Sequence, residues 1–131
     1  MLQLIEVSKR YDAADGAASG CVLREVSLAL GAGESAAITG PSGSGKSTLL
    51  NIIGTLDRPT SGQVLLEGRD LSRLNELELA AIRNRRIGFV FQSHHLLPHC
   101  TVLENVLVPT LALKDAGARP EAETRARALL D

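Results

Sequence analysis

A glycine-rich stretch with one lysine carries the strongest chemical signal in the sequence. Residues 40–47 read Gly-Pro-Ser-Gly-Ser-Gly-Lys-Ser and fit the phosphate-binding pattern G-x-x-x-x-G-K-[ST] at every fixed position. Glycines let the backbone approach an anion closely, and successive N–H groups then form an anion-binding nest. The residues predicted to bind a nucleoside triphosphate are Gly40, Pro41, Ser42, Gly43, Ser44, Gly45, Lys46, Ser47 and Thr48.

Within this stretch, three side chains have distinct chemical roles. The ammonium group of Lys46 is expected to reach the outer phosphates as a compact cation. The hydroxyl group of Ser47 is expected to ligate Mg²⁺, and Thr48 can add a phosphate contact. The pattern indicates a nucleoside triphosphate, but by itself it does not identify the base or the reaction.

The sequence also predicts the secondary-structure elements on either side of this loop. Residues 35–39 form a short run of small residues that we interpret as a strand leading into the loop. After the loop, apolar residues recur at helical spacing, which predicts one buried helical face; they are Leu49, Ile52, Ile53 and Leu56. The positive dipole end of that helix favours an anion.

The rest of the chain alternates strand and helix signals. Strands are predicted at residues 2–7, 26–30 and 63–66, and a surface loop is predicted at residues 12–20. The continuous apolar run at 87–91 predicts a further strand, covered on both faces. Helix starts are predicted where a capping residue precedes a glutamate by three positions, namely Asn75 with Glu78 and Thr101 with Glu104.

Prolines and charge pairs mark the later helices. The helix that opens at Thr101 should run toward Leu113, with Pro109 kinking or ending it. Pro120 suits the first turn of a last helix. That helix carries two i,i+4 pairs, Glu121 with Arg125 and Glu123 with Arg127.

Composition bounds the class of protein. With 131 residues, 44% of them hydrophobic, and a net charge of −1, the chain fits one soluble globular domain at most and offers no global basic field for nucleic acid. No apolar run is long enough for a bilayer span, and Glu6 argues against a signal peptide, so we expect an intracellular chain. Cys21 and Cys100 are interpreted as reduced packing residues.

Several strings resemble the ATP-binding subunits of ABC transporters, and the resemblance covers essentially all 131 residues. Val-Ser-Lys-Arg-Tyr at 7–11 resembles the adenine-stacking loop of that family, which implies that Tyr11 stacks on adenine. Residues 88–98, GFVFQSHHLLP, resemble its Q-loop, which implies that Gln92 contacts Mg²⁺ and the attacking water. The resemblance thus implies ATP and Mg²⁺ as cofactors, with Lys46 and Gln92 as catalytic residues.

Further strings narrow the family and its architecture. LDRPTSGQV at 56–64 and TVLENV at 101–106 are similar to family segments, and SHHLLP most resembles the branch for lipoprotein release and macrolide export. The implied fold is an α/β P-loop NTPase (RecA-like) core with an N-terminal antiparallel β subdomain, truncated at the start of the helical subdomain. Residues 1–92 would be the ATP-binding core, and residues 93–131 the Q-loop exit and the beginning of the helical subdomain.

The resemblance also implies a function and partners. A full-length member couples ATP binding and hydrolysis to export or lipoprotein release, as a homodimer of ATPase subunits on a transmembrane permease. It lies peripherally at the cytoplasmic face of the inner membrane. The Asp-Glu strand end, the LSGGQ-like signature and the switch histidine do not occur in the sequence. We therefore expect an N-terminal fragment that binds ATP, hydrolyses it negligibly and exposes apolar sheet edges.

Other interpretations stay open on the residues alone. The phosphate loop also fits a small kinase or a non-catalytic regulatory module, whereas a GTPase would need an N-K-x-D string that is absent. His94, His95 and His99 lack ligand spacing for zinc, so we interpret their loop as a contact to a membrane subunit. The basic group at 83–86 is interpreted as a solvated face near a helix C-terminus.

Overall fold

The computed structural model describes residues 1–11, 20–112 and 118–131. They form two compact units, Met1–Arg83 and Asn84–Asp131. The predicted loop at 12–20 and the end of the helix predicted to reach Leu113 fall largely outside the described residues. The phosphate loop lies in the first unit.

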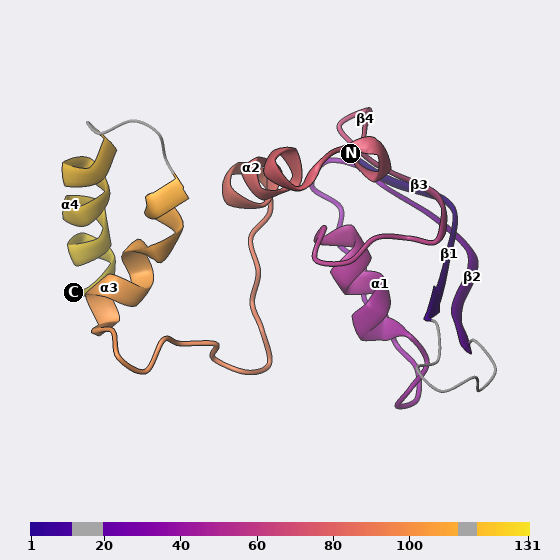
Figure 1. Cartoon of the computed structure of the whole chain (residues 1–131), viewed down its shortest axis with the longest axis horizontal. Helices are drawn as coiled ribbons and strands as arrows, with labels where there is room; N and C mark the ends of the chain where they lie inside the picture. Colours follow the sequence, from indigo (N-terminus) through magenta and orange to yellow (C-terminus); the bar gives the residue numbers. More distant parts are fainter. Residues whose placement is uncertain (12–19, 113–117) are drawn as a thin grey trace. The chain divides into compact units, whose positions relative to one another are not determined.

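An antiparallel sheet of four strands forms one side of the first unit. The strands are β1 (Leu2–Tyr11), β2 (Gly20–Leu30), β3 (Ser61–Leu66) and β4 (Arg69–Asp70), in the spatial order β2-β1-β3-β4. Figure 1 shows β1 running between β2 and β3. The strands predicted at 2–7, 26–30 and 63–66 are confirmed, and the first two extend well beyond the predicted bounds.

A bulge in β1 explains why its apolar residues do not alternate. Leu4 and Val7 are both buried although three positions separate them, which a regular strand cannot achieve on one face. Glu6 between them takes a positive φ of 49°, and the register with β2 shifts there. Its freed N–H group donates to Ser27 Oγ at 3.0 Å. The extra residue thus returns the apolar side chains to the core face.

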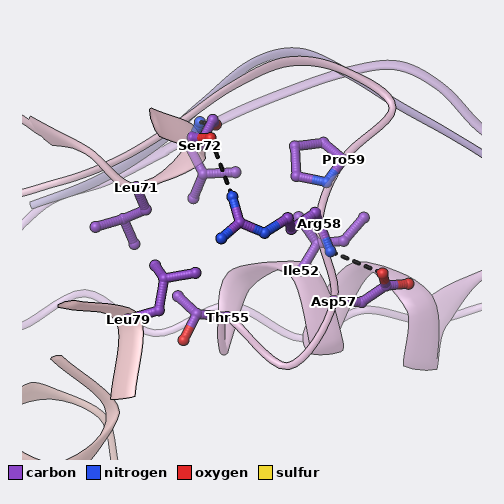
Figure 2. Close-up of a pocket in the computed structure, with 9 residues that line it drawn as sticks. Ile52, Thr55, Asp57, Arg58, Pro59, Leu71, Ser72 and Leu79 are labelled. Atoms are coloured by element: carbon purple, nitrogen blue, oxygen red, sulfur yellow. Dashed lines mark hydrogen bonds between the residues drawn. The ribbon is translucent and has the colours of Figure 1, made fainter. Parts of the chain in front are cut away.

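The core of the first unit lies between this sheet and the helices that follow it. Helix α1 (Lys46–Ile53) begins at the phosphate loop, and a short 3₁₀ turn η1 (Leu71–Arg73) precedes helix α2 (Glu76–Arg86). The buried apolar side chains of this unit are Leu4, Val7, Leu23, Leu49, Ile52, Val64, Leu71, Leu79 and Ile82. Figure 2 shows Ile52, Leu71 and Leu79 among the residues that line one pocket of this unit.

Helix α2 starts where the sequence predicted. The Glu78 N–H group donates to Asn75 Oδ1 at 3.0 Å, and the Asn75 N–H group donates to Glu78 Oε2 at 3.0 Å. This reciprocal pair is a capping box, and it satisfies two N–H groups at the helix start. The predicted helix start is confirmed.

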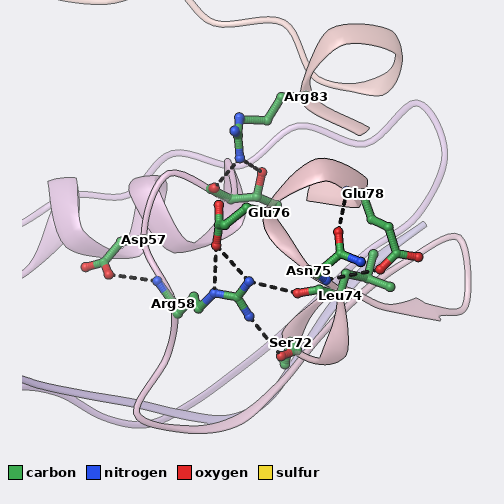
Figure 3. Close-up of polar contacts among 9 residues, drawn as sticks. Asp57, Arg58, Ser72, Leu74, Asn75, Glu76, Glu78 and Arg83 are labelled. Carbon is green, nitrogen blue, oxygen red and sulfur yellow. Dashed lines mark hydrogen bonds and ion pairs between the residues drawn. The ribbon is translucent and has the colours of Figure 1, made fainter. Parts of the chain in front are cut away.

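Two arginines tie the turn after α1 to both ends of α2 (Figure 3). The Arg58 guanidinium donates to Glu76 Oε1 at 2.7 and 3.1 Å and to the Leu74 carbonyl oxygen at 2.8 Å. Arg83 donates to the carbonyl oxygen of Thr55 at 2.8 Å. The interpretation of the 83–86 group as a solvated face is therefore wrong for Arg83, which provides a hydrogen-bond donor to the carbonyl oxygen of the buried Thr55.

Two predicted strands, at residues 35–39 and 87–91, are wrong. Neither segment forms a strand, and among the described residues the sheet contains only the four strands named above. A strand exists only where a neighbour supplies its backbone hydrogen bonds. Val90 is fully exposed, and Phe91 is about half exposed. Apolar composition predicts that such a run will be buried, but it does not provide the neighbouring strand.

The second unit is built from helices. Helix α3 (Val102–Leu107) carries the predicted capping box, in which the Glu104 N–H group donates to Thr101 Oγ1 and the Glu104 carboxylate accepts from the Thr101 N–H group. It passes into a 3₁₀ turn η2 (Val108–Ala112), which contains Pro109, as the predicted kink implies.

The last helix, α4 (Ala118–Leu130), packs against α3, and its buried residue is Ala126. Its predicted pair Glu123–Arg127 is confirmed, with 2.7 Å between Arg127 Nη2 and Glu123 Oε1. Asn105 of α3 accepts from the Leu97 N–H group at 2.8 Å and donates to the Cys100 carbonyl oxygen at 3.1 Å. The loop before α3 is therefore tied to that helix.

The close approach of β3 to the β1 bulge makes a prediction about stability. Gly62 has a φ of 88°, and a Cβ there would overlap the Glu6 carbonyl oxygen and lie 2.6 Å from the Ile5 carbonyl oxygen. Gly33 has a similar φ of 79° but open space around it. We expect Gly62→Ala to lower the free energy of unfolding by about 1–3 kcal/mol more than Gly33→Ala, because only the former adds a clash. Urea unfolding followed by circular dichroism measures both, and equal losses would contradict this packing.

Candidate nucleotide-binding site

The glycine-rich loop is curled. Gly40, Gly43 and Gly45 have φ values of 149°, 79° and 86°, all in the left-handed region that side chains disfavour. The Ser44 N–H group donates back to the Pro41 carbonyl oxygen at 3.3 Å, which closes the turn. A Cβ on Gly40 would lie 2.9 Å from Ser44 Oγ, so the Ser44 side chain would have to shift to admit one.

Helix α1 starts inside this loop and supplies N–H donors. Its first backbone bond runs from the Leu49 N–H group to the Gly45 carbonyl oxygen at 2.8 Å. The N–H groups of Lys46, Ser47 and Thr48 precede that bond, so helix geometry provides them with no acceptor. They lie at the positive end of the helix dipole. The start of α1 therefore offers several donors to an anion.

Strand β2 supports the loop from one side. A Cβ on Gly45 would lie 2.9 Å from Leu23 Cδ2 and 3.0 Å from the Val22 carbonyl oxygen. Only glycine allows the helix start to approach β2 so closely. The helix start is thus held at a defined place against the sheet.

Lys46 closes the loop. Its Nζ donates to the carbonyl oxygens of Gly40 at 2.9 Å and Pro41 at 2.6 Å, with Ser44 Oγ at 3.4 Å. The ammonium group therefore sits at the loop itself. This places one full positive charge beside the N–H donors of the helix start.

Together these groups line an open hollow of about 470 Å³, within the range of small-molecule sites. Its lining residues are Val22, Ser42, Gly43, Gly45, Lys46, Ser47 and Thr48. N–H donors, one ammonium group and hydroxyl groups match the charge and acceptors of a polyphosphate. The Ser47 hydroxyl group in the same lining is an oxygen ligand of the kind that Mg²⁺ accepts, so the donor set fits this metal.

Tyr11, predicted to stack on adenine, lies at the end of β1 in the same unit. Tyr11 is 44% exposed, and its hydroxyl group donates to Asp57 Oδ2 at 2.7 Å. Lys9 Nζ lies 4.7 Å from the ring centroid and 2.6 Å from Asp57 Oδ1. Sequence reasoning missed Lys9 and Asp57. Lys9 could have been noticed because it lies two positions from Tyr11 on the same strand, whereas no local signal marks Asp57.

Gln92, predicted to contact Mg²⁺, belongs to the second unit and is exposed. Its neighbour Phe91 stacks on Phe89 with ring centroids 5.2 Å apart and meets His95 edge-on at 4.8 Å. These ring contacts link the residues on either side of Gln92. The role of Gln92 toward the metal stays a prediction.

The family model for the ABC transporter matches residues 23–131, which include the phosphate loop and all that follows it. The chain belongs to the ABC transporter family. This confirms the resemblance found in the sequence. Among the described residues, no helix combines the length and apolar character that a bilayer crossing requires.

Individual members of the family are similar to the whole chain. Identity is 52% to the lipoprotein-releasing system ATP-binding protein LolD 1 of Rhodopirellula baltica, over all of this chain and 56% of that protein. It is 49% to an uncharacterized ABC transporter ATP-binding protein of Thermotoga maritima, over all of this chain and 54% of that protein. The chain thus spans about half the length of the curated relatives it matches.

A solved structure supports the fold assignment. The ATP-binding cassette MJ0796, described as a dimer in a post-hydrolysis state bound to ADP and Pi, matches with a TM-score of 0.87 and 43% identity. The match covers 98% of this chain and 55% of that one. The predicted P-loop fold with an N-terminal antiparallel sheet is confirmed.

The Asp57 cluster predicts how stability depends on pH. Burial raises the pKa of Asp57, but hydrogen bonds from Lys9, Tyr11 and the Arg58 N–H group outweigh it and hold the pKa below its ordinary value of 3.8. A lowered pKa in the folded state stabilises the protein above pH 3.8, and this contribution is lost as the pH falls through the lowered value.

We therefore expect the difference in unfolding free energy between the unsubstituted chain and Asp57→Asn to be constant from about pH 7 to about pH 5. It should shrink once the pH drops below 3.8. Urea unfolding at a series of pH values measures it. A difference that is the same at neutral and acidic pH would contradict the assigned role of the carboxylate.

Proposed function

We propose that the chain binds Mg·ATP at the hollow formed by residues 40–48 and the start of α1. The observation that carries this proposal is the curled loop whose carbonyl oxygens hold the Lys46 ammonium group beside the N–H donors of the helix start. Positive charge and aligned donors at one point are what a triphosphate requires. No competing acidic side chain lines the hollow among the described residues.

Each predicted site residue has a role in this proposal. The loop and the first turn of α1 donate N–H groups to the phosphates, and Lys46 exchanges the loop carbonyls for the outer phosphates. Ser47 supplies a hydroxyl ligand to Mg²⁺, which neutralises phosphate charge when bound. Tyr11 stacks on adenine, and Gln92 supplies its amide oxygen to the same metal.

We further propose that the whole protein is the ATP-binding subunit of a transporter for export or lipoprotein release. The support is the similarity to LolD 1, which is described as part of a lipoprotein-releasing system. The partners would be a membrane permease and a second copy of the subunit, at the cytoplasmic face of the inner membrane. The dimeric state described for the cassette MJ0796 supports the second copy.

Replacing the ammonium group tests the binding proposal. We expect Lys46→Ala to weaken Mg·ATP binding by about 10-fold or more, because a charge-assisted contact to the outer phosphates is lost. Arg69→Ala is the matched control, since Arg69 is a surface cation of the same unit paired with Glu78 at 2.9 Å. Titration calorimetry measures both variants. Equal affinity of the Lys46 variant and the control would refute the proposed site, and a strong preference for GTP would favour a different P-loop protein.

Hydrolysis provides a separate test. Phosphoryl transfer needs many groups positioned at once, and residues 1–131 contain no LSGGQ-like string. We propose that this stretch alone binds Mg·ATP and releases phosphate at the background rate. A phosphate-release assay on purified residues 1–131 measures it. Turnover that disappears in Lys46→Ala would show that the stretch is catalytic by itself.

A further inference from the structure

We propose that Asp57 is a positioning residue that orients the ring of Tyr11 for the base of the nucleotide. The inference rests on the proposed function, because it concerns the base at the same site. It comes from a cluster of three side chains, Lys9, Tyr11 and Asp57, which we call the Asp57 cluster. The cluster lies outside the phosphate hollow, within the same unit.

The ring of Tyr11 needs an anchor. Tyr11 is the last residue of β1 and is 44% exposed, so packing alone leaves its side-chain torsions free to change. A hydrogen bond restrains it, from its hydroxyl group to Asp57 Oδ2 at 2.7 Å. A hydrogen bond to an ionised carboxylate is among the stronger ones in proteins. It therefore selects one ring orientation.

Asp57 is itself held in place. Its Oδ1 accepts from Lys9 Nζ at 2.6 Å and from the Arg58 N–H group at 2.7 Å. Lys9 also donates to the Arg58 carbonyl oxygen at 2.8 Å, and its side chain is only 11% exposed. One carboxylate oxygen is thus committed to the turn, which leaves the other to accept from the Tyr11 hydroxyl group.

The turn that carries Asp57 is tied to the phosphate-binding helix. The N–H groups of Leu56 and Asp57 both donate to the carbonyl oxygen of Asn51 in α1, at 2.8 and 3.2 Å. Helix α1 starts with the proposed phosphate donors and ends at this turn. The position of the Tyr11 ring is therefore fixed relative to α1, the same element that carries the proposed phosphate donors.

Lys9 restrains the ring a second time. Its Nζ lies 4.7 Å from the ring centroid, within cation–π range. The same ammonium group holds Asp57, so the ring is restrained through both its face and its hydroxyl group. Stacking of a base on an aromatic ring changes affinity by roughly 5- to 150-fold. If the Tyr11 ring has to be ordered when the nucleotide binds, the cost of ordering it reduces the affinity gained from stacking.

A ligand without a base distinguishes a role of Asp57 in orienting the Tyr11 ring from a role in supporting α1. We would measure binding of Mg·ATP and of magnesium tripolyphosphate to the full chain by calorimetry, with Asp57→Ala, Tyr11→Phe and the double variant. Tyr11→Phe keeps the ring and removes only the bond, at an exposed position that folding tolerates. The matched control is Asp70→Ala, because Asp70 is a carboxylate of the same unit that accepts from Gln63 and from the Ser72 N–H group.

We expect Asp57→Ala and Tyr11→Phe each to weaken ATP binding by roughly 3- to 10-fold, since ring ordering is then left to the ligand. Tripolyphosphate affinity should stay within about twofold, because the phosphate loop is untouched. The double variant should bind ATP as Asp57→Ala does, because both substitutions remove the same bond. Asp70→Ala should change neither ligand.

Several outcomes would overturn the inference. Equal weakening of both ligands by Asp57→Ala would mean that Asp57 only supports α1, and unchanged ATP affinity in Tyr11→Phe would mean that the bond does not orient the ring. A selective loss of ATP binding in Asp70→Ala would mean that the loss in Asp57→Ala is not specific to the Asp57 cluster. Failure of the proposed function is distinct, because the unsubstituted chain would then bind neither ligand, or Lys46→Ala would bind both normally.

Discussion

The close contact between the start of α1 and β2 is the constraint on which the site depends. At Gly45 the backbone lies so near Val22 and Leu23 that a Cβ would meet atoms at 2.9 and 3.0 Å. The same residue takes the left-handed conformation that turns the loop into the helix. This one approach sets where the helix points, and it therefore sets where its free N–H donors and the Lys46 ammonium group lie.

The far end of α1 is constrained by different forces. There, charged side chains tie the turn to the surrounding elements. Asp57 binds Lys9 and Tyr11 of β1. Arg58 binds the start of α2, and Arg83 binds Thr55 (Figure 3). Such contacts contribute little net stability where solvent screens them, but they fix geometry. Helix α1 is thus held by backbone proximity at one end and by a polar network at the other. That arrangement suits an element that carries the donors of the proposed phosphate site.

Local patterns were read correctly where neighbouring residues supply the interaction. The capping boxes at Asn75 and Thr101 formed as predicted, because each needs only a side chain and an N–H group three positions apart. The strands predicted at 35–39 and 87–91 did not form, because a strand needs a partner that composition cannot provide. The bulge at Glu6 was also missed, since it responds to burial on one face of the sheet.

The family and the residues of the proposed phosphate site could be predicted from the sequence alone. A nest of N–H groups, a cation and a hydroxyl group arise from eight contiguous residues, so their spacing along the chain carries the information. In contrast, the hydrogen bond from Tyr11 to Asp57, 46 positions away, and the close approach of Gly62 to the β1 bulge became visible only in the folded chain. Those relations depend on how the strands pair and where α1 ends, and no local spacing encodes a contact made across the fold.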